Sequence, residues 1–394
     1  MAVATTTPNR WIMLAVSMIG QSASSMYVNA TPFLIPYLHL EQGLSLVEAG
    51  LVASSATVGM MLTMYAWGAI VDRIGERTSM SVGLAILATG ATAAAFSTSF
   101  IWLAIFLFIG GMGGASTNSA SGRVVIGWFP PDRRGTAMGI RQTAQPVGVG
   151  LAALLIPNLV DAFDLRTAVL SIAVICGLTA LLTAVLIVDP PRPTRAEAAD
   201  LGQLDNPYRR DDRLWRIHLA SMLLVVPQFT VWTFTLVWLI DEKGWSTLAA
   251  SILVAATQVL GSLGRIAAGT WSDRAGSRLR PMRSVAAVAA VTLVALGVFE
   301  STPLAIGIIV MASVVTVADN GLAFTSVAEI SGPYWSGRAL GAQNTGQYLA
   351  AAASPPVIGA LITGTGYGWA FGLVAVFPLI AIPLVPVKGE TPST

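Results

Sequence analysis

The sequence has one cysteine, two histidines and few charged residues, and each scarcity removes a class of function. The single cysteine, Cys176, excludes an intramolecular disulfide and a cysteine-rich metal site. His39 and His218 lie near the ends of expected helices without partners at metal-ligand spacing, so no metal site is predicted. Charged residues make up 11% of the 394 positions and hydrophobic residues 54%. That balance, with a mean hydropathy of +0.71, is far from that of an ordinary soluble domain.

Two copies of one short motif lie about half a chain apart. Both have the form G-x-x-x-D-R-x-G-x-R, one at residues 68–77 and the other at residues 269–278, an offset of 201. A second pair of matching segments, 135–145 and 337–347, aligns without a gap at an offset of 202. A repeat of about 200 residues is too long for a solenoid element. The sequence therefore predicts a duplicated chain.

The two motif copies resemble the loop that follows the second helix in each half of Major Facilitator Superfamily transporters. The halves of those transporters are parallel repeats. The resemblance covers the whole chain. It implies an all-α membrane protein with twelve transmembrane helices in two pseudo-symmetric six-helix bundles.

Apolar runs agree with that architecture, because a helix needs about 20 mainly apolar residues to span a bilayer. The expected helices are 11–38, 45–71, 78–97, 100–128, 135–160, 167–188, 214–240, 246–272, 283–299, 303–330, 337–363 and 368–387. The stretch between the sixth and seventh helices is rich in proline and charge, which is typical of a linker. The predicted domains are an N-terminal bundle, 1–188, a cytoplasmic linker, 189–213, and a C-terminal bundle, 214–394.

Arginine and lysine gather on one side of these helices. With both termini inside the cell, the cytoplasmic segments hold 17 of the 22 and the external loops hold two. The positive-inside rule therefore predicts a multi-pass protein of the cell inner membrane with both termini cytoplasmic. The other three, Arg123, Arg141 and Arg265, lie inside expected helices.

Two of these arginines are predicted to bind an anionic substrate. A cation near the bilayer centre costs about 2.5–3.5 kcal/mol on insertion scales, so it normally faces a cavity or a partner. Arg265 corresponds to Met64 in the first half, and Arg141 corresponds to Gln343 in the second. The repeat itself therefore does not require arginine at either position. For Arg265 the alternative is structural pairing to a neighbouring helix. For Arg141 the alternative is a guanidinium that extends toward the cytoplasm.

The lone deep carboxylate is Asp319, whose counterpart in the first half is Thr117. Two roles stay open for it: a proton-coupling site, or a fixed counter-ion to Arg265. A substrate carboxylate that competed for Arg265 would leave Asp319 unpaired in apolar surroundings, which favour the protonated form. Substrate and proton would then move together.

The repeated motif has its own expected mechanics. Asp72 and Asp273 lie near the cytoplasmic helix ends, where they can bond the motif arginines or the N-terminus of a helix in the other half. By resemblance to the superfamily, such contacts form a conformational latch, and Arg123 is predicted to join it. The predicted latch residues are Asp72, Arg73, Arg77, Asp273, Arg274, Arg278 and Arg123.

Neutral polar and aromatic side chains complete the predicted site. They fall on helices that line the cavity in this superfamily. The predicted substrate-binding residues are Arg265, Arg141, Gln145, Asn320, Gln347, Tyr348, Tyr27 and Trp232.

The segment 263–269, which contains Arg265, looks like the arginine-bearing helix eight of anion-handling branches. Residues 127–139 are similar to sequences of the organic-anion and cyanate/nitroimidazole branches. The second arginine of nitrate porters and the helix-eleven lysine of oxalate exchangers are absent. Drug/proton antiporter patterns also fail, because Leu107 replaces their helix-four arginine and Gln145-Pro146 replaces their Gly-Pro.

We therefore expect a secondary transporter of a small, monocarboxylate-like organic anion, working by alternating access and coupled to protons as a symporter. The alternative is a proton-driven exporter of drugs or other xenobiotics. The expected partners are the substrate, protons and the lipid bilayer, and the expected state is a monomer. No enzymatic activity, cofactor or nucleic-acid partner is expected. No catalytic triad is apparent, and the glycine run 110–114 lacks the nucleotide-loop pattern.

Overall fold

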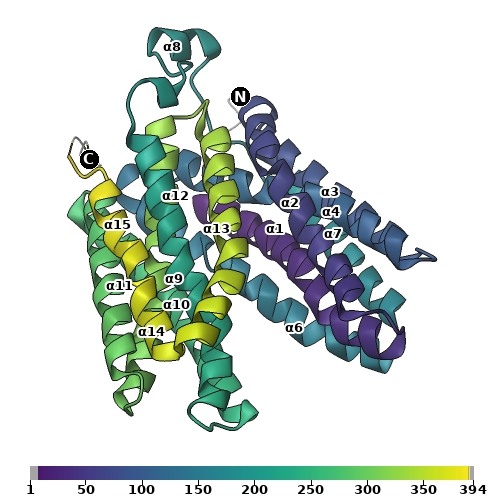
Figure 1. The fold of residues 1–394 in the computed structure, drawn as a ribbon. Helices are drawn as coiled ribbons and strands as arrows, with labels where there is room; N and C mark the ends of the chain where they lie inside the picture. The colour runs from purple at the N-terminus through teal and green to yellow at the C-terminus, as the bar shows by residue number, and fades with distance from the viewer. Residues whose placement is uncertain (1–7, 389, 391–394) are drawn as a thin grey trace. The chain divides into compact units, whose positions relative to one another are not determined.

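The computed structural model describes residues 8–388 and 390, and within them the chain forms helices and connecting turns without a strand. The all-α prediction is confirmed (Figure 1). Packing divides the chain into two compact units. Unit 1 comprises Met1–Phe129, Thr143–Asp205 and Gly332–Asn344. Unit 2 comprises Pro130–Gln142, Asn206–Ser331 and Thr345–Thr394.

Unit 1 contains most helices of the first half of the sequence, together with the start of α13. Its elements are α1 (Arg10–Ala30), the 3-10 turn η1 (Thr31–Leu34), the π turn η2 (Tyr37–Glu41), α2 (Leu46–Ile74), α3 (Glu76–Ala95), α4 (Phe100–Trp128), α6 (Ala144–Ala162), α7 (Leu165–Leu186), the short α8 (Arg195–Asp200) and the first residues of α13 (Ser336–Thr365).

Unit 2 contains the helices of the second half and one short helix from the first. Its elements are the 3-10 turn η3 (Pro131–Arg133), α5 (Arg134–Arg141), the 3-10 turn η4 (Pro207–Arg209), α9 (Arg213–Asp241), α10 (Thr247–Ala275), α11 (Leu279–Phe299), α12 (Leu304–Ser331), the remainder of α13, α14 (Tyr367–Val374) and α15 (Val376–Leu384).

Eleven helical segments of the described chain are long and apolar enough to cross a membrane. α1, with 21 residues, is not among them. It carries several polar side chains that bond inside unit 1. Ser24 Oγ donates to the Gly114 carbonyl at 2.9 Å, and Gln21 Nε2 donates to Asn118 Oδ1 at 2.9 Å. Polarity on α1 is therefore used for packing against α4.

Three expected helices are interrupted in the structure. The first ends at Ala30 and continues as the η1 and η2 turns, because Pro32 and Pro36 lack the N–H that an α-helix needs. The fifth divides at residues 142–143 into α5 and α6, with Pro146 in the first turn of α6. The last divides at Ala375 into α14 and α15. By contrast, α9 runs through Pro227 without a break.

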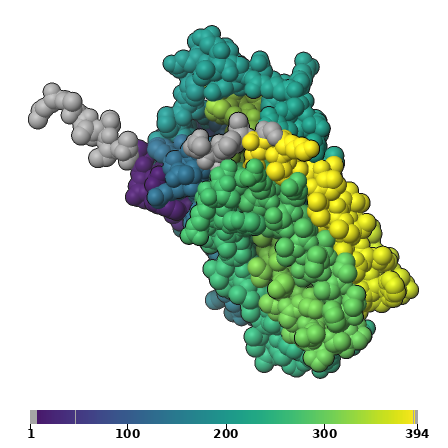
Figure 2. Space-filling model, turned by 90° about the vertical axis from the view of Figure 1, so that its left-hand side faces the viewer, coloured from purple at the N-terminus to yellow at the C-terminus, as the bar shows by residue number. Residues whose placement is uncertain are grey.

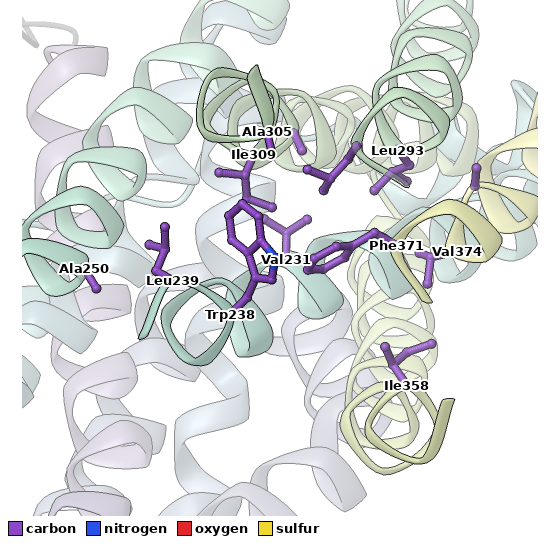
Figure 3. Close-up of a cluster of buried hydrophobic side chains, with 13 residues drawn as sticks. Val231, Trp238, Leu239, Ala250, Leu293, Ala305, Ile309, Ile358, Phe371 and Val374 are labelled. Atoms are coloured by element: carbon purple, nitrogen blue, oxygen red, sulfur yellow. The ribbon is translucent and has the colours of Figure 1, made fainter. Parts of the chain in front are cut away.

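The core of unit 2 is an apolar cluster around Trp238, which is fully buried on α9 (Figure 3). Phe371 of α14 meets it edge-on, with ring centroids 6.1 Å apart. Val231, Leu293 and Ile309 belong to the same cluster, which joins α9, α11, α12 and α14. On the surface, α11 and α14–α15 run side by side (Figure 2).

A polar group closes the rim of this cluster. Trp238 Nε1 donates to Glu300 Oε1 at 2.7 Å, and Lys243 Nζ lies 3.0 Å from the same oxygen. The loop after α11 is thus tied to the end of α9 by one carboxylate.

The duplication extends to carboxylates that cap helices. Asp189, after α7, accepts a hydrogen bond from the Arg77 backbone N–H at 2.8 Å. Glu390, after α15, accepts from the Arg278 backbone N–H at 2.6 Å. Both the acids and the capped residues are 201 positions apart. The segment after the sixth helix of each half therefore fastens the start of that half's third helix, α3 or α11.

Candidate functional site

Arg265 on α10 is a buried cation of unit 2 with an open hydrogen-bonding atom. Only 4% of its surface is exposed, and its Nε has no hydrogen-bond partner. No acid among the described residues forms an ion pair with it. Its nearest aromatic contact is Trp232 of α9, whose ring centroid lies 5.8 Å from Cζ. A buried guanidinium without a counter-ion is costly, so a bound anion would stabilise this arrangement.

Asp319 on α12 is the matching unsatisfied acid. It is 1% exposed, and Oδ2 has no hydrogen-bond donor. Arg265 and Asp319 interact electrostatically without forming a salt bridge. Unit 2 therefore holds a buried cation and a buried anion that are near one another and each left with an open hydrogen-bonding atom.

A chain of neutral polar side chains lies beside them. Gln347 Nε2 donates to Ser221 Oγ at 2.7 Å and to Asn320 Oδ1 at 3.1 Å. Asn320 Nδ2 in turn donates to Gln228 Oε1 at 2.9 Å. This polar chain, Ser221–Gln347–Asn320–Gln228, links α13, α12 and α9. Asn320 directly follows Asp319, so a member of the polar chain and the buried acid lie on the same turn of α12.

Arg141 on α5 is buried but supported. It is 2% exposed, and Nη1 donates to Gln142 Oε1 at 2.7 Å. Cζ lies 5.6 Å from the centroid of the Phe324 ring on α12. Tyr348 of α13 interacts with it electrostatically. Both predicted anion-binding arginines thus belong to unit 2.

Glycine lets the two arginine-bearing helices approach closely. A Cβ placed on Gly139 of α5 would lie 2.6 Å from the Arg265 carbonyl oxygen of α10. Side chains larger than hydrogen therefore do not fit at residue 139. The contact sets the backbone of α5 two residues before Arg141 directly against Arg265.

Two of the predicted substrate-binding residues belong to unit 1. Tyr27 is 1% exposed, and its hydroxyl donates to the Leu107 carbonyl at 2.9 Å, inside the α1–α4 packing. Gln145 is half-buried on α6, and its backbone carbonyl accepts from Ser25 Oγ at 2.9 Å. The other six, Arg265, Arg141, Asn320, Gln347, Tyr348 and Trp232, belong to unit 2.

Sequence reasoning missed Gln228 and Ser221. Gln228 precedes Trp232 by four residues and so shares its face of α9. The repeat offset held a signal, because residue 228 corresponds to Tyr27 at an offset of 201. An amide in the second half thus corresponds to an aromatic side chain in the first half.

The motif aspartates cap helices that come from the opposite half of the sequence. Asp72 accepts from the backbone N–H groups of Gly337 at 2.8 Å and Arg338 at 3.0 Å, at the start of α13. It also lies 2.6 Å from Arg123 Nη1. Arg123 Nε is 2.9 Å from Glu76. Asp72 is thereby placed at the centre of a buried charge network in unit 1.

Asp273 does the same in unit 2. It accepts from the backbone N–H groups of Gly135 at 2.9 Å and Thr136 at 2.7 Å, at the start of α5. Arg278 Nη1 is 2.5 Å from Asp273, and Arg278 also pairs with Glu329 at 3.3 Å. Helix capping and ion pairing thus occur together in both copies.

The other motif arginines have different contacts. Arg77 Nε donates to the Ala184 carbonyl at 2.6 Å rather than to Asp72. The side chains of Arg73 and Arg274 make no hydrogen bond or ion pair with any residue that the structure describes. Of the four motif arginines, Arg278 alone contacts its own motif aspartate in the described structure.

No group of three or more His, Cys, Asp or Glu side chains within residues 8–388 and 390 could hold a metal ion. What the geometry does offer is a buried arginine, a buried acid and a chain of amides among membrane-length helices. Together with the repeated motif, these features describe a duplicated, all-α protein with helices of membrane-spanning length.

Comparison with known proteins gives the family. The Major Facilitator Superfamily model matches residues 11–355, so the chain belongs to that superfamily. It is 49% identical over 381 residues to an uncharacterized MFS-type transporter of Mycobacterium tuberculosis, covering 96% of this chain and 85% of the relative. The hexuronate transporter of Bacillus subtilis is 24% identical over 246 residues, which cover 60% of this chain and 58% of that protein.

Solved structures agree on the fold. The crystal structure of the fucose:proton symporter of E. coli has a TM-score of 0.76 and 17% sequence identity. The match covers 97% of this chain and 100% of the other. The two six-helix halves of that fold are those expected from the repeat.

Proposed function

We propose that this protein is a secondary active transporter that carries a small organic anion across the cytoplasmic membrane by alternating access. The observation that carries the proposal is Arg265, a buried guanidinium that forms no salt bridge with a described residue, has an open Nε and lies beside Trp232. A substrate carboxylate would supply the missing acceptor and could bond guanidinium through two parallel hydrogen bonds. The relative named as a hexuronate transporter supports an organic acid as cargo.

Arg141 is the second cation of the proposed anion clamp. Its guanidinium is already oriented by Gln142 and Phe324, so it contributes a positioned charge at low entropic cost. Asn320, Gln347 and Tyr348 are the proposed neutral contacts of this site in unit 2.

Asp319 is the proposed proton-coupling residue. While the site is empty, the Asp319 charge stabilises Arg265 through their electrostatic interaction. A bound carboxylate would take over Arg265 and leave two anions close together in buried surroundings, which favours protonation of Asp319. A monovalent substrate would then be carried electroneutrally with one proton. The proposed orientation has both termini in the cytoplasm, with the Asp72 and Asp273 contacts as the latch.

The proposal is tested by the thermal midpoint of the purified chain in a series of carboxylates, since a ligand of the native state raises stability by mass action. Arg265→Met should abolish the shift. Arg283→Met, which removes an exposed arginine on α11, should preserve it. A full carboxylate response in Arg265→Met would refute the anion site.

Coupling is tested separately in proteoliposomes. Asp319→Asn should retain substrate exchange but lose accumulation driven by a pH gradient. Accumulation equal to that of the parent at the same imposed gradient would exclude Asp319 as the coupling site.

A second candidate function is proton-driven export of a cationic drug, which the unpartnered acid at Asp319 would favour. The same preparation distinguishes the two. A thermal shift with a lipophilic cation, lost in Asp319→Asn and retained in Arg265→Met, would support export in place of anion transport.

A further inference from the structure

We propose that the transporter selects carboxylates that carry hydroxyl groups, and that Gln228 determines this selectivity through the Ser221–Gln347–Asn320–Gln228 polar chain. The inference rests on the proposed anion-transport function. It narrows the substrate class from small organic anions to hydroxylated carboxylic acids.

Two amide atoms of the polar chain are left open. Gln347 donates to both Ser221 and Asn320, and Asn320 donates to Gln228. No described residue accepts from Gln228 Nε2 or donates to Gln347 Oε1. Gln228, at one end of the chain, thus offers a donor, and Gln347, inside the chain, offers an acceptor. A hydroxyl group both donates and accepts, so it can bond either atom.

Burial makes the open atom of Gln228 informative. Gln228 is 4% exposed, whereas Gln347 is half-buried. Taking an amide out of water without its hydrogen bonds is unfavourable, and buried polar groups are normally satisfied. A ligand that brings only a hydrocarbon tail would leave the Gln228 amide unsatisfied. One that brings hydroxyls would not.

The position of Gln228 matches the second group of such a ligand. Gln228 and Trp232 are four residues apart on α9, which places them about 6 Å apart along one face. Trp232 lies against Arg265. A carboxylate bound at Arg265 therefore has its neighbouring carbons within reach of the Gln228 amide, about one helical turn away.

The first half of the chain contains a corresponding amide cluster, which can be compared with the polar chain of unit 2. Asn118 corresponds to Asn320 at an offset of 202, and it also bonds a glutamine, Gln21. There both amide atoms of Gln21 are used, because Ser121 Oγ donates to Gln21 Oε1 at 3.0 Å. Asn118 Nδ2 meets the Met60 sulfur at 3.7 Å. The amide cluster of unit 1 closes on itself, whereas the one in unit 2 stays open.

The competing explanation is that the polar chain only holds α9, α12 and α13 together, as interhelical hydrogen bonds do in many membrane proteins. The two explanations differ in what Gln228→Met would change. A purely structural amide affects stability and treats all ligands alike. A recognition amide changes the ratio of affinities between hydroxylated and unsubstituted acids.

The experiment uses the full chain in detergent and two ligand pairs matched in carbon number: glycerate against propionate, and gluconate against hexanoate. Apparent affinities come from ligand-dependent thermal midpoints, and counterflow in proteoliposomes confirms transport. The matched control is Thr230→Val, which removes a buried hydroxyl from the same helix. That hydroxyl bonds only the α9 carbonyl of Val226, at 2.8 Å.

The parent and Thr230→Val should prefer each hydroxylated acid over its partner by tenfold or more, as expected when a ligand lacking a hydroxyl leaves a buried amide unpaired. Gln228→Met should weaken binding of the hydroxylated acids about tenfold, leave the unsubstituted acids unchanged and bring the preference close to one.

Equal affinities within each pair for the parent would overturn hydroxyl recognition while leaving anion transport standing. A Gln228→Met variant that weakens both members of each pair equally would overturn it too, in favour of a structural amide. Absence of any carboxylate response in the parent, with Arg265→Met indistinguishable from it, would instead refute the proposed function on which the inference rests.

Discussion

Asp72 is a single carboxylate that serves four donors, and removing it should expose how much the start of α13 depends on it. In unit 1 it accepts from Gly337 N, Arg338 N and Arg338 Nε, the last at 3.1 Å, and it pairs with Arg123 at 2.6 Å. The Asp72 side chain is 1% exposed and that of Arg123 is 3% exposed. Solvent cannot replace the lost partner at these positions.

The size of the effect follows from that burial. Removing one partner of a buried, hydrogen-bonded ion pair destabilises a protein by about 3–5 kcal/mol, because the remaining charge is left uncompensated. Glu76 still holds Arg123 at 2.9 Å, which favours the lower part of that range. For a unit of about 200 residues, each kcal/mol moves the midpoint by about 2–4 °C. At about 3 kcal/mol, Asp72→Ala should therefore lower the apparent midpoint by about 6–12 °C.

The chain supplies its own reporter for this measurement. Cys176 on α7 is the one cysteine of the sequence and is fully buried in unit 1. A thiol-reactive fluorogenic dye therefore reports unfolding of unit 1 without an added label. The matched control is Asp161→Ala, which removes an exposed carboxylate at the end of α6. If Asp72→Ala and Asp161→Ala melt within about 1 °C of one another, the capping and ion-pair reasoning is wrong.

Three further predictions concern other contacts. Gly68→Ala should destabilise unit 1 in the same assay, because its new Cβ would clash with the Gly337 carbonyl oxygen, whereas Gly150→Ala on α6, with open space around it, should not lower the midpoint. Glu390→Ala should speed hydrogen exchange at the Arg278 and Leu279 amides about fivefold, since a lost helix cap costs about 1 kcal/mol; unchanged exchange would mean that the cap is not formed. Burial acts to raise the pKa of Glu300, but bonds from Trp238 and Lys243 outweigh it and hold that pKa below its ordinary value of 4.5. The stabilisation is therefore present above pH 4.5 and lost as the pH falls through the folded-state pKa, and Glu300→Gln should remove this acid-dependent part of unfolding followed by tryptophan fluorescence.

Much of the fold could be predicted because bilayer length and duplication constrain it strongly. Helix count and the half-chain repeat follow from apolar run length and from the two motif copies. The helix interruptions were harder to predict, because proline ends a helix at some positions and is accommodated within the helix at others. Pro32 and Pro36 end α1, whereas Pro227 lies within an unbroken α9. The predicted domain boundaries at residues 188 and 214 remain a prediction.

The sequence singled out the buried charges of the candidate site and two members of its polar chain, Asn320 and Gln347, but it did not single out Gln228 or Ser221. Buried arginine and aspartate are expensive, so Arg265 and Asp319 stood out against an apolar background. An amide in an apolar helix stands out less, and Gln228 was missed because its role depends on a contact with Asn320 across two helices. Tyr27 is predicted as a substrate contact from its aromatic ring, but its hydroxyl bonds the α4 backbone. The helix caps at Asp189 and Glu390 were missed because their partners lie more than 100 residues away.

The internal repeat also separates structural from functional residues, because each half is a control for the other. Where the halves keep the same chemistry, the side chains are satisfied: Asp72 and Asp273 cap helices, as do Asp189 and Glu390. Where they differ, the second half carries polar groups with open atoms. Arg265, Asp319 and Gln228 stand where the first half has Met64, Thr117 and Tyr27. All three of those first-half residues are buried, and the hydroxyls of Thr117 and Tyr27 bond backbone carbonyls. The fold therefore needs no charge or amide at these positions, and this contrast between the halves supports the proposal of a substrate site in unit 2.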